Sequence, residues 1–303
     1  TANYLEDIPA ALRDRLEIIN ISSYTELEKA AIARRHLLPK QLKMNGLKPS
    51  QLKIDDEMIL YLIKFYTRES GVRQLERLLG TLSRKAVLAI LKDGKKSIKI
   101  TKKLINEWLG HEIFDYGKRE KSDQVGTVTG LAYTSFGGDV LQIEVTHFEG
   151  KGKFVITGQL GDVMKESASI AYDYVRANAK KYKIDSKLFE SEDIHIHVPE
   201  GAVPKDGPSA GVTLTTALVS SLAKVPVKAD LAMTGEVTLR GNVLPIGGLK
   251  EKTMAAHRCG ISTVIIPKGN VKDIDDLPQT VKDSVKIIPV ENVSQVIDLA
   301  LVR

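Results

Sequence analysis

Residues 204–212 read PKDGPSAGV, and this stretch separates a strand-like segment from a helix-like one. Residues 193–198 alternate apolar and polar side chains, which predicts a strand. Residues 209–222 are rich in Ala, Leu and Val and predict a buried helix. The Gly-Pro pair between them favours a tight turn. We therefore expect Ser209 at the start of a helix, where free backbone N–H groups point outward.

Two interpretations of Ser209 follow from this position. The serine could cap the helix, which is a common role for serine at a helix start. It could also be a nucleophile, with nearby N–H groups holding the oxyanion that forms during attack on a carbonyl. A nucleophilic serine needs a base, and His195 and His197 on the preceding strand are candidates. The same two histidines could form a metal pair or simply lie on the polar face of an edge strand.

A second informative stretch, residues 233–260, contains five glycines and leads into a predicted helix over residues 250–259. Lys250 and Lys252 would lie in the first turn of this helix, where the helix dipole disfavours a positive charge. Apolar walls around a lysine also disfavour its charged form. These two effects could give a neutral lysine able to accept a proton. The alternative is that both lysines are ordinary surface residues.

Strand and helix patterns are mixed throughout residues 125–303, which predicts an α+β or a mixed α/β domain. The two early strands flank the turn at Gly137 and Gly138, and strand–helix alternation follows later. The remaining predicted elements are strands over residues 125–133, 140–147, 153–157, 229–234, 263–266 and 286–289, and helices over residues 162–181 and 293–299.

Residues 21–115 form a separate domain that is predicted to be helical, because apolar residues recur there at helical spacing. A helix is expected over residues 25–43, another from Asp55 or Asp56, and a long one that ends at Gly94. Residues 116–124 are charged and lack periodicity, and we interpret them as a linker.

The composition of the 303 residues sets further limits. The net charge of +6 permits a secondary contact with DNA, but the basic residues are scattered and no aromatic residues lie between them. No apolar run approaches the ~20 residues of a membrane helix, so no membrane role is expected. The single cysteine allows no internal disulfide and suits a reducing cytoplasm.

Four stretches together resemble the Lon family of ATP-dependent proteases. PKDGPSAGVTL is similar to the nucleophile segment of that family, and TGEVTLRGNVLPIGGLKEK is similar to its general-base segment. TANYLEDIPAALRDRLEII resembles the end of the AAA+ nucleotide-binding core, which would occupy residues 1–20. GVRQLER resembles the second sensor motif of the small AAA+ lid. The resemblance implies a multi-domain chain, an all-α lid followed by an α+β proteolytic domain, cut from a larger protein.

The resemblance also implies roles for individual residues. Ser209 would be the nucleophile, Lys252 its general base, and Thr234 the residue that orients Lys252. Polar positions around the family's site correspond to Asp206, His195, His197 and Glu144. No metal is implied. Two rival interpretations remain: a nucleotide-binding domain of the small-metabolite kinase type, and a non-catalytic binding module on a similar fold.

Three further positions resemble nucleotide-sensing residues of the family: Asn3 the first sensor, Arg15 the arginine finger, and Arg73 the second sensor. The family uses ATP and Mg, forms hexamers in the cytoplasm, and degrades misfolded and regulatory proteins in quality control and stress response. The sequence contains no GxxxxGK[ST] phosphate loop. We therefore expect this chain to need no cofactor and to retain at most ATP-independent peptidase activity.

Overall fold

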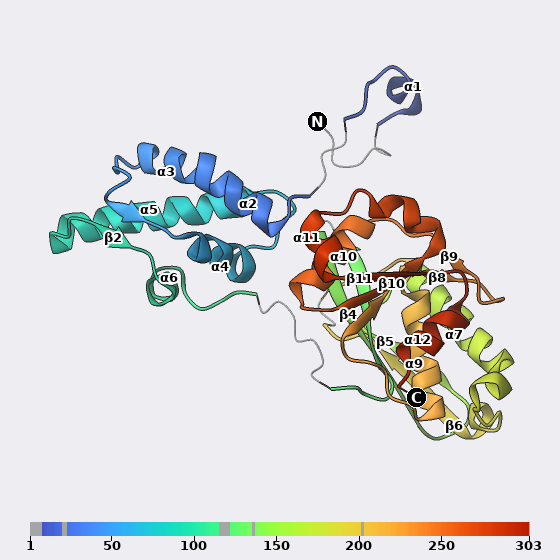
Figure 1. The fold of residues 1–303 in the computed structure, drawn as a ribbon. Helices are drawn as coiled ribbons and strands as arrows, with labels where there is room; N and C mark the ends of the chain where they lie inside the picture. Colours follow the sequence, from blue (N-terminus) through green and yellow to red (C-terminus); the bar gives the residue numbers. More distant parts are fainter. Residues whose placement is uncertain (1–7, 20–22, 115–121, 135–136, 201–202, 303) are drawn as a thin grey trace.

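The computed structural model describes all residues except 1–7, 20–22, 115–121, 135–136, 201–202 and 303. Figure 1 shows two bodies, a helical one drawn in blue to teal and a larger one drawn in green to red. This arrangement confirms the predicted fold class of a helical domain followed by an α+β domain with a mixed sheet. Among the described residues, no helix has the length and apolar character needed to cross a membrane.

The helical body packs around one apolar core. Its first helix is capped by Thr25, whose side chain forms a capping box with Glu28. Its longest helix ends at Gly94, which adopts a left-handed conformation with φ of +66° and so stops the helix. The elements are α2 (Glu26–Ile32), a π-helical segment (Ala33–Leu37), α3 (Leu38–Met44), β1 (Leu52–Lys53), α4 (Asp56–Tyr66), α5 (Arg73–Asp93), β2 (Ile98–Lys99) and α6 (Lys102–Leu109).

The helix predicted over residues 25–43 is therefore interrupted by a π-helical segment. Pro39 follows that segment and has no N–H to donate to the carbonyl four residues earlier, so the regular α-helical bonding cannot run through it. A short helix, α1 (Ala10–Arg13), precedes this body and buries no residue.

The larger body is built on a seven-stranded sheet with the order β11-β10-β7-β3-β4-β6-β5. β4 pairs antiparallel with β3 and with β6, and the other neighbours pair in parallel, so the sheet is mixed. Its strands are β3 (Thr127–Thr134), β4 (Gly137–Glu149), β5 (Phe154–Thr157), β6 (Glu192–His197), β7 (Leu231–Met233), β10 (Thr263–Pro267) and β11 (Lys286–Val290). A separate small hairpin joins β8 (Glu236–Val237) to β9 (Val243–Leu244).

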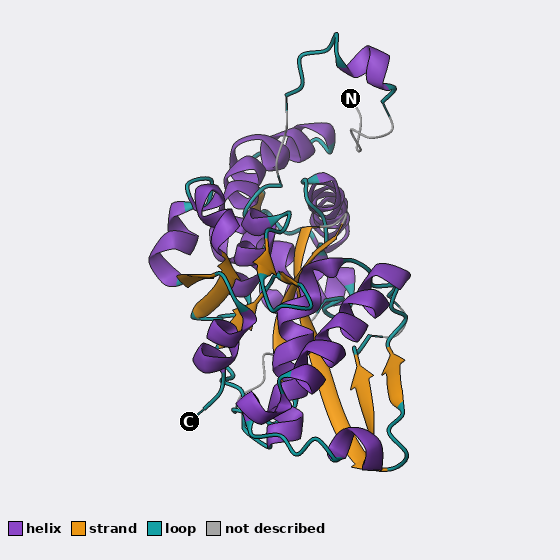
Figure 2. Ribbon diagram, turned by 90° about the vertical axis from the view of Figure 1, so that its right-hand side faces the viewer, coloured by secondary structure: helices purple, strands orange, loops and turns teal. Residues whose placement is uncertain are grey.

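Helices pack against both faces of this sheet (Figure 2), because successive strand residues point to opposite sides. In β10, Ile265 belongs to one apolar core, while Val264 and Ile266 belong to the other. The helical elements are α7 (Asp162–Ala177), a 3₁₀ segment (Ala179–Tyr182), α8 (Leu188–Ser191), the 3₁₀ turn η3 (Pro208–Ala210), α9 (Gly211–Ala223), α10 (Leu249–Arg258), a 3₁₀ segment (Lys268–Ile274), α11 (Gln279–Ser284) and α12 (Val293–Ala300).

Two of these helices, α9 and α10, pack on opposite faces of the middle of the sheet. α9 contributes to the same core as Met233 of β7, and α10 contributes to the core on the opposite face, with Ala232. Thr234, which directly follows β7, therefore lies between the start of α9 and the start of α10. This placement brings two distant sequence stretches together at one end of a central strand.

Candidate active site

Ser209 lies in the 3₁₀ turn η3, ahead of α9. The N-cap of α9 is Ala210, and no side chain caps that helix. The interpretation of Ser209 as a helix cap is therefore wrong. The Ser209 backbone is bonded to the segment between β7 and β8. Its carbonyl accepts a hydrogen bond from the Gly235 N–H at 2.8 Å. The side chain is partly exposed, as a nucleophile that meets substrate must be.

Lys252 lies in the first half of α10 and is almost fully buried, with 2% of its surface exposed. Burial favours the neutral amine over the ammonium ion and lowers the pKa of Lys252 from 10.5 to about 8. The sequence predicted this effect from the helix dipole and from apolar walls, and burial is the cause that the structure supplies. A lysine with a pKa near 8 is partly neutral at physiological pH and can accept a proton.

Thr234 connects the lysine to the serine. Its hydroxyl accepts a hydrogen bond from Lys252 Nζ at 3.2 Å and donates one to the Ser209 carbonyl at 3.3 Å. A neutral amine has two N–H donors and one lone pair. Because one donor is directed to Thr234, the rotation of the amine is restrained and its lone pair remains available for a proton.

Ser209 and Lys252 line one cavity of about 270 Å³. Apolar residues form much of its wall, including Leu131 and Met164. Asp206 also lines the cavity, and its Oδ1 accepts hydrogen bonds from the N–H groups of Met164, at the start of α7, and of Gly207. Asp206 thus fixes the turn that carries Ser209 by bonding it to a neighbouring helix.

The other polar residues singled out from the sequence lie away from this cavity. His195 and His197 are on β6 and share the hydroxyl of Thr157, which lies 2.9 Å from His195 Nε2 and 2.7 Å from His197 Nδ1. Glu144 is directly opposite His197 on β4. None of these four is among the residues that line the cavity with Ser209. Within the described part of the chain, no group of three or more His, Cys, Asp or Glu side chains is placed to hold a metal ion.

Of the three residues that resemble nucleotide sensors, the structure describes Arg15 and Arg73. Asn3 lies outside the described residues. Arg15 is exposed after α1, and Arg73 is exposed at the first position of α5. Because the sequence has no phosphate loop, these residues do not fit a bound nucleotide by themselves.

Sequence reasoning missed two residues that line the cavity, Arg68 and Asp139. Arg68 belongs to the helical body, and Asp139 is on β4. Their side chains form an ion pair. No local motif marks either residue. The pair could not be recognised from the sequence because its two members are 71 positions apart.

Comparison with known proteins places this chain in a family. The family model described as the Lon protease (S16) C-terminal proteolytic domain matches residues 99–303, which is more than half of the chain. The chain belongs to the Lon protease family. The model of the Lon protease AAA+ ATPase lid domain matches residues 43–101, which include α4 and α5.

Curated Lon proteases resemble the chain over nearly its whole length. Lon protease of Bacillus thuringiensis (strain Al Hakam) is 55% identical over 302 residues, covering 100% of the chain and 38% of that protein. Lon protease 1 of Bacillus subtilis (strain 168) is 55% identical and covers 100% of the chain and 39% of that protein. Lon protease of Vibrio parahaemolyticus is 54% identical over 298 residues, covering 98% of the chain and 38% of that protein. The chain therefore spans about two fifths of the length of these Lon relatives.

Proposed function

We propose that this chain is a serine endopeptidase in which Ser209 attacks the peptide carbonyl and Lys252 is the general base. One observation carries the proposal: a buried lysine with a pKa lowered to about 8 shares a hydroxyl partner and a cavity with a serine at a helix start. Membership of the Lon family supports it, since the matching model is that of a proteolytic domain.

The reaction proceeds in two stages. In the first, Ser209 Oγ forms a bond to the carbonyl carbon while its proton passes to Lys252 Nζ. Backbone N–H groups around Ser209 stabilise the oxyanion. When the C–N bond breaks, Lys252 returns the proton to the leaving amine, and an ester on Ser209 remains. In the second stage, Lys252 takes a proton from water while the water oxygen bonds to the ester carbonyl carbon. The C–Oγ bond then breaks, Lys252 returns the proton to Ser209 Oγ, and the acid is released.

Thr234 and Asp206 act on the geometry of this site. Thr234 restrains the amine of Lys252, and Asp206 holds the turn around Ser209 through its bonds to Gly207 and α7. His195, His197 and Glu144 lie on neighbouring strands outside the cavity, so in this proposal they take no part in the proton transfer.

The substrates of the whole protein would be unfolded and regulatory proteins, degraded in the cytoplasm by an ATP-driven homo-oligomeric ring. The sequence of this chain contains no phosphate loop, so in this proposal the chain does not itself unfold a substrate with ATP. We expect it to cleave short or unfolded peptides and to leave folded proteins intact.

The proposal is tested with a fluorogenic peptide and a fluorophosphonate probe. A nucleophilic serine displaces fluoride from the probe and keeps the phosphonyl group, so mass spectrometry of a digest locates it. We expect one adduct, on Ser209, and loss of peptide cleavage in proportion to labelling. Labelling of another serine with the same loss of activity would show that the nucleophile is misassigned.

The rate of peptide cleavage should depend on pH through Lys252. Because only the neutral amine accepts a proton, the rate rises about tenfold per pH unit below the pKa and levels off above about pH 8. The measurement is kcat/KM for the peptide from about pH 6 to about pH 9.5. A rate that is flat across this range, or that falls as pH increases, would contradict the role of Lys252.

Replacing Thr234 with valine should reduce kcat about 10- to 100-fold, since the amine of Lys252 loses the partner that restrains it. Thr234 is buried and valine has nearly its shape, so packing is conserved. Thr234→Ser retains the hydroxyl and should keep most of the activity. Equal activity of the valine and serine variants would show that the hydroxyl has no catalytic importance.

A further inference from the structure

The end of β4 closest to the helical body, residues 137–140 and here called the strand start, packs directly on the peptide group of Lys252. A Cβ atom added to Gly138 would collide with the Glu251 carbonyl and lie 2.9 Å from the Lys252 backbone nitrogen. β4 and the first half of α10 therefore touch backbone to backbone. Interiors packed in this way transmit displacement, so a shift of the strand start moves Lys252.

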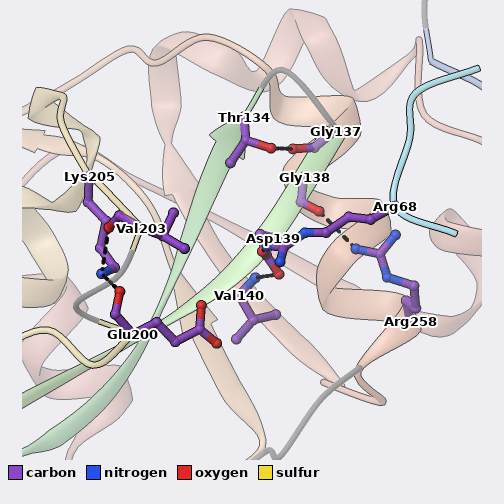
Figure 3. A network of polar contacts seen from close by, with 10 residues as sticks. All are labelled: Arg68, Thr134, Gly137, Gly138, Asp139, Val140, Glu200, Val203, Lys205 and Arg258. Atoms are coloured by element: carbon purple, nitrogen blue, oxygen red, sulfur yellow. Dashed lines mark hydrogen bonds and ion pairs between the residues drawn. The ribbon is translucent and has the colours of Figure 1, made fainter. Parts of the chain in front are cut away.

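The helical body reaches this strand start through Arg68, in the loop between α4 and α5 (Figure 3). Arg68 Nη2 donates to Asp139 Oδ2, and both side chains are about two thirds buried, with 32% and 27% exposed. Each residue of this ion pair makes a further hydrogen bond within its own body. The Arg68 N–H donates to Gln74 Oε1 at 2.9 Å, and the other oxygen of Asp139 accepts from the Val140 N–H at 2.9 Å.

Arg258 provides a second connection at the far end of α10 (Figure 3). Its Nη2 donates to the Gly138 carbonyl at 2.8 Å. Its Nε lies 3.9 Å from Oε1 of Glu26, the first residue of α2. The helix that carries Lys252 is thus bound to the strand start near both of its ends, and the helical body contacts both places.

We propose that Arg68 is a positioning residue for the proteolytic site: its ion pair with Asp139 fixes the strand start and, through Gly138, the position of Lys252. The inference rests on the proposed function for its kinetic consequences, but not for its structural ones. Arg68 also lines the cavity of Ser209 and Lys252, so the helical body contributes a side chain to that cavity.

A direct role in binding substrate would give a different result from a role in positioning. A positioning residue affects the chemical step and the pKa of the base, so its loss lowers kcat with little change in KM. A residue that binds substrate raises KM, and the change depends on the charge of the peptide. A residue that only supports the fold alters the melting temperature and leaves the kinetics of the folded protein unchanged.

The test compares Arg68→Ala with Arg77→Ala in the whole chain. Arg77 is an exposed arginine on α5, so its loss removes the same charge from the same body. We expect Arg68→Ala to reduce kcat about tenfold, to leave KM within about twofold, and to shift the apparent pKa of the pH–rate profile. The charge reversal Arg68→Asp should lower kcat further, and adding Asp139→Arg should restore it. Equal kinetics of the two alanine variants would overturn the proposal, as would an effect on KM alone.

Amide hydrogen exchange gives a result that does not depend on catalysis. The Lys252 N–H bonds to the Gly248 carbonyl at 3.0 Å, so its exchange reports the order of the first turn of α10. We expect exchange in residues 249–258 to be about tenfold faster in Arg68→Ala than in Arg77→Ala. Unchanged exchange would contradict the proposal even if no peptide were cleaved. If Ser209→Ala left cleavage intact while exchange responded to Arg68, the dyad would be wrong and the coupling would stand.

Discussion

Replacing Ser209 with alanine is expected to reduce peptide cleavage at least ~10³-fold, because the acyl-enzyme route requires its oxygen. The change removes one oxygen from a partly exposed side chain, so the fold and the cavity remain. The residual rate would come from substrate binding and oxyanion stabilisation alone. The measurement is the initial rate on a fluorogenic peptide at about pH 8.5, where Lys252 is mostly neutral.

Ser169→Ala is the matched control for this variant. Ser169 is an exposed serine on α7 whose hydroxyl bonds only locally, to the Lys165 carbonyl at 3.1 Å. We expect it to leave the rate unchanged. If Ser209→Ala kept more than about a tenth of the parent rate, the serine would not be the nucleophile.

Replacing Lys252 with methionine should reduce cleavage about 10³-fold and at the same time stabilise the fold. Activity is lost because no other group in the proposal accepts the serine proton. Stability increases because methionine fills the same buried space without a charge. At pH 7, below the folded-state pKa of about 8, the lysine is mostly protonated in both states, so the folded state bears most of the cost of burying the charge. The lowering from 10.5 to about 8 corresponds to about 3 kcal/mol.

The measurements are peptide cleavage and the midpoint of thermal unfolding at pH 7. Lys250→Met is the control, since it changes a less buried lysine two positions earlier on the same helix. We expect it to retain activity and to show no comparable gain in stability. A Lys252→Met protein that was less stable than the parent would show that the buried amine contributes favourable bonds exceeding its burial cost.

Much of the secondary structure was predictable because local chemistry determines it. Predicted helix limits at Asp55 or Asp56 and at Gly94 are confirmed by α4 and α5. Gly94 ends α5 because glycine adopts the left-handed conformation without steric cost. The helix predicted from residue 209 begins two residues later, at Gly211, because Pro208 starts a 3₁₀ turn that includes Ser209.

The sequence also identified Ser209, Lys252 and Thr234 as candidates, through turn chemistry, helix starts and resemblance to Lon proteases. It could not rank the polar residues around them. His195 and Glu144 were candidates equal to Asp206, yet only Asp206 lines the cavity with Ser209. Which of these residues meet depends on the order of strands in the sheet. The histidines are on β6, and β3 and β4 lie between β6 and β7, the strand that Thr234 follows.

By itself, then, the sequence determined the two-part fold, the turn that exposes Ser209 and the helix that carries Lys252. Only the tertiary structure decided that Lys252 is buried, that Thr234 joins it to Ser209, and that Arg68 of the helical body reaches the strand packed against it. The physical reason is that a pKa and a side-chain position depend on all surrounding atoms. At Lys252 those atoms come from segments more than a hundred positions apart in the chain, such as Gly138.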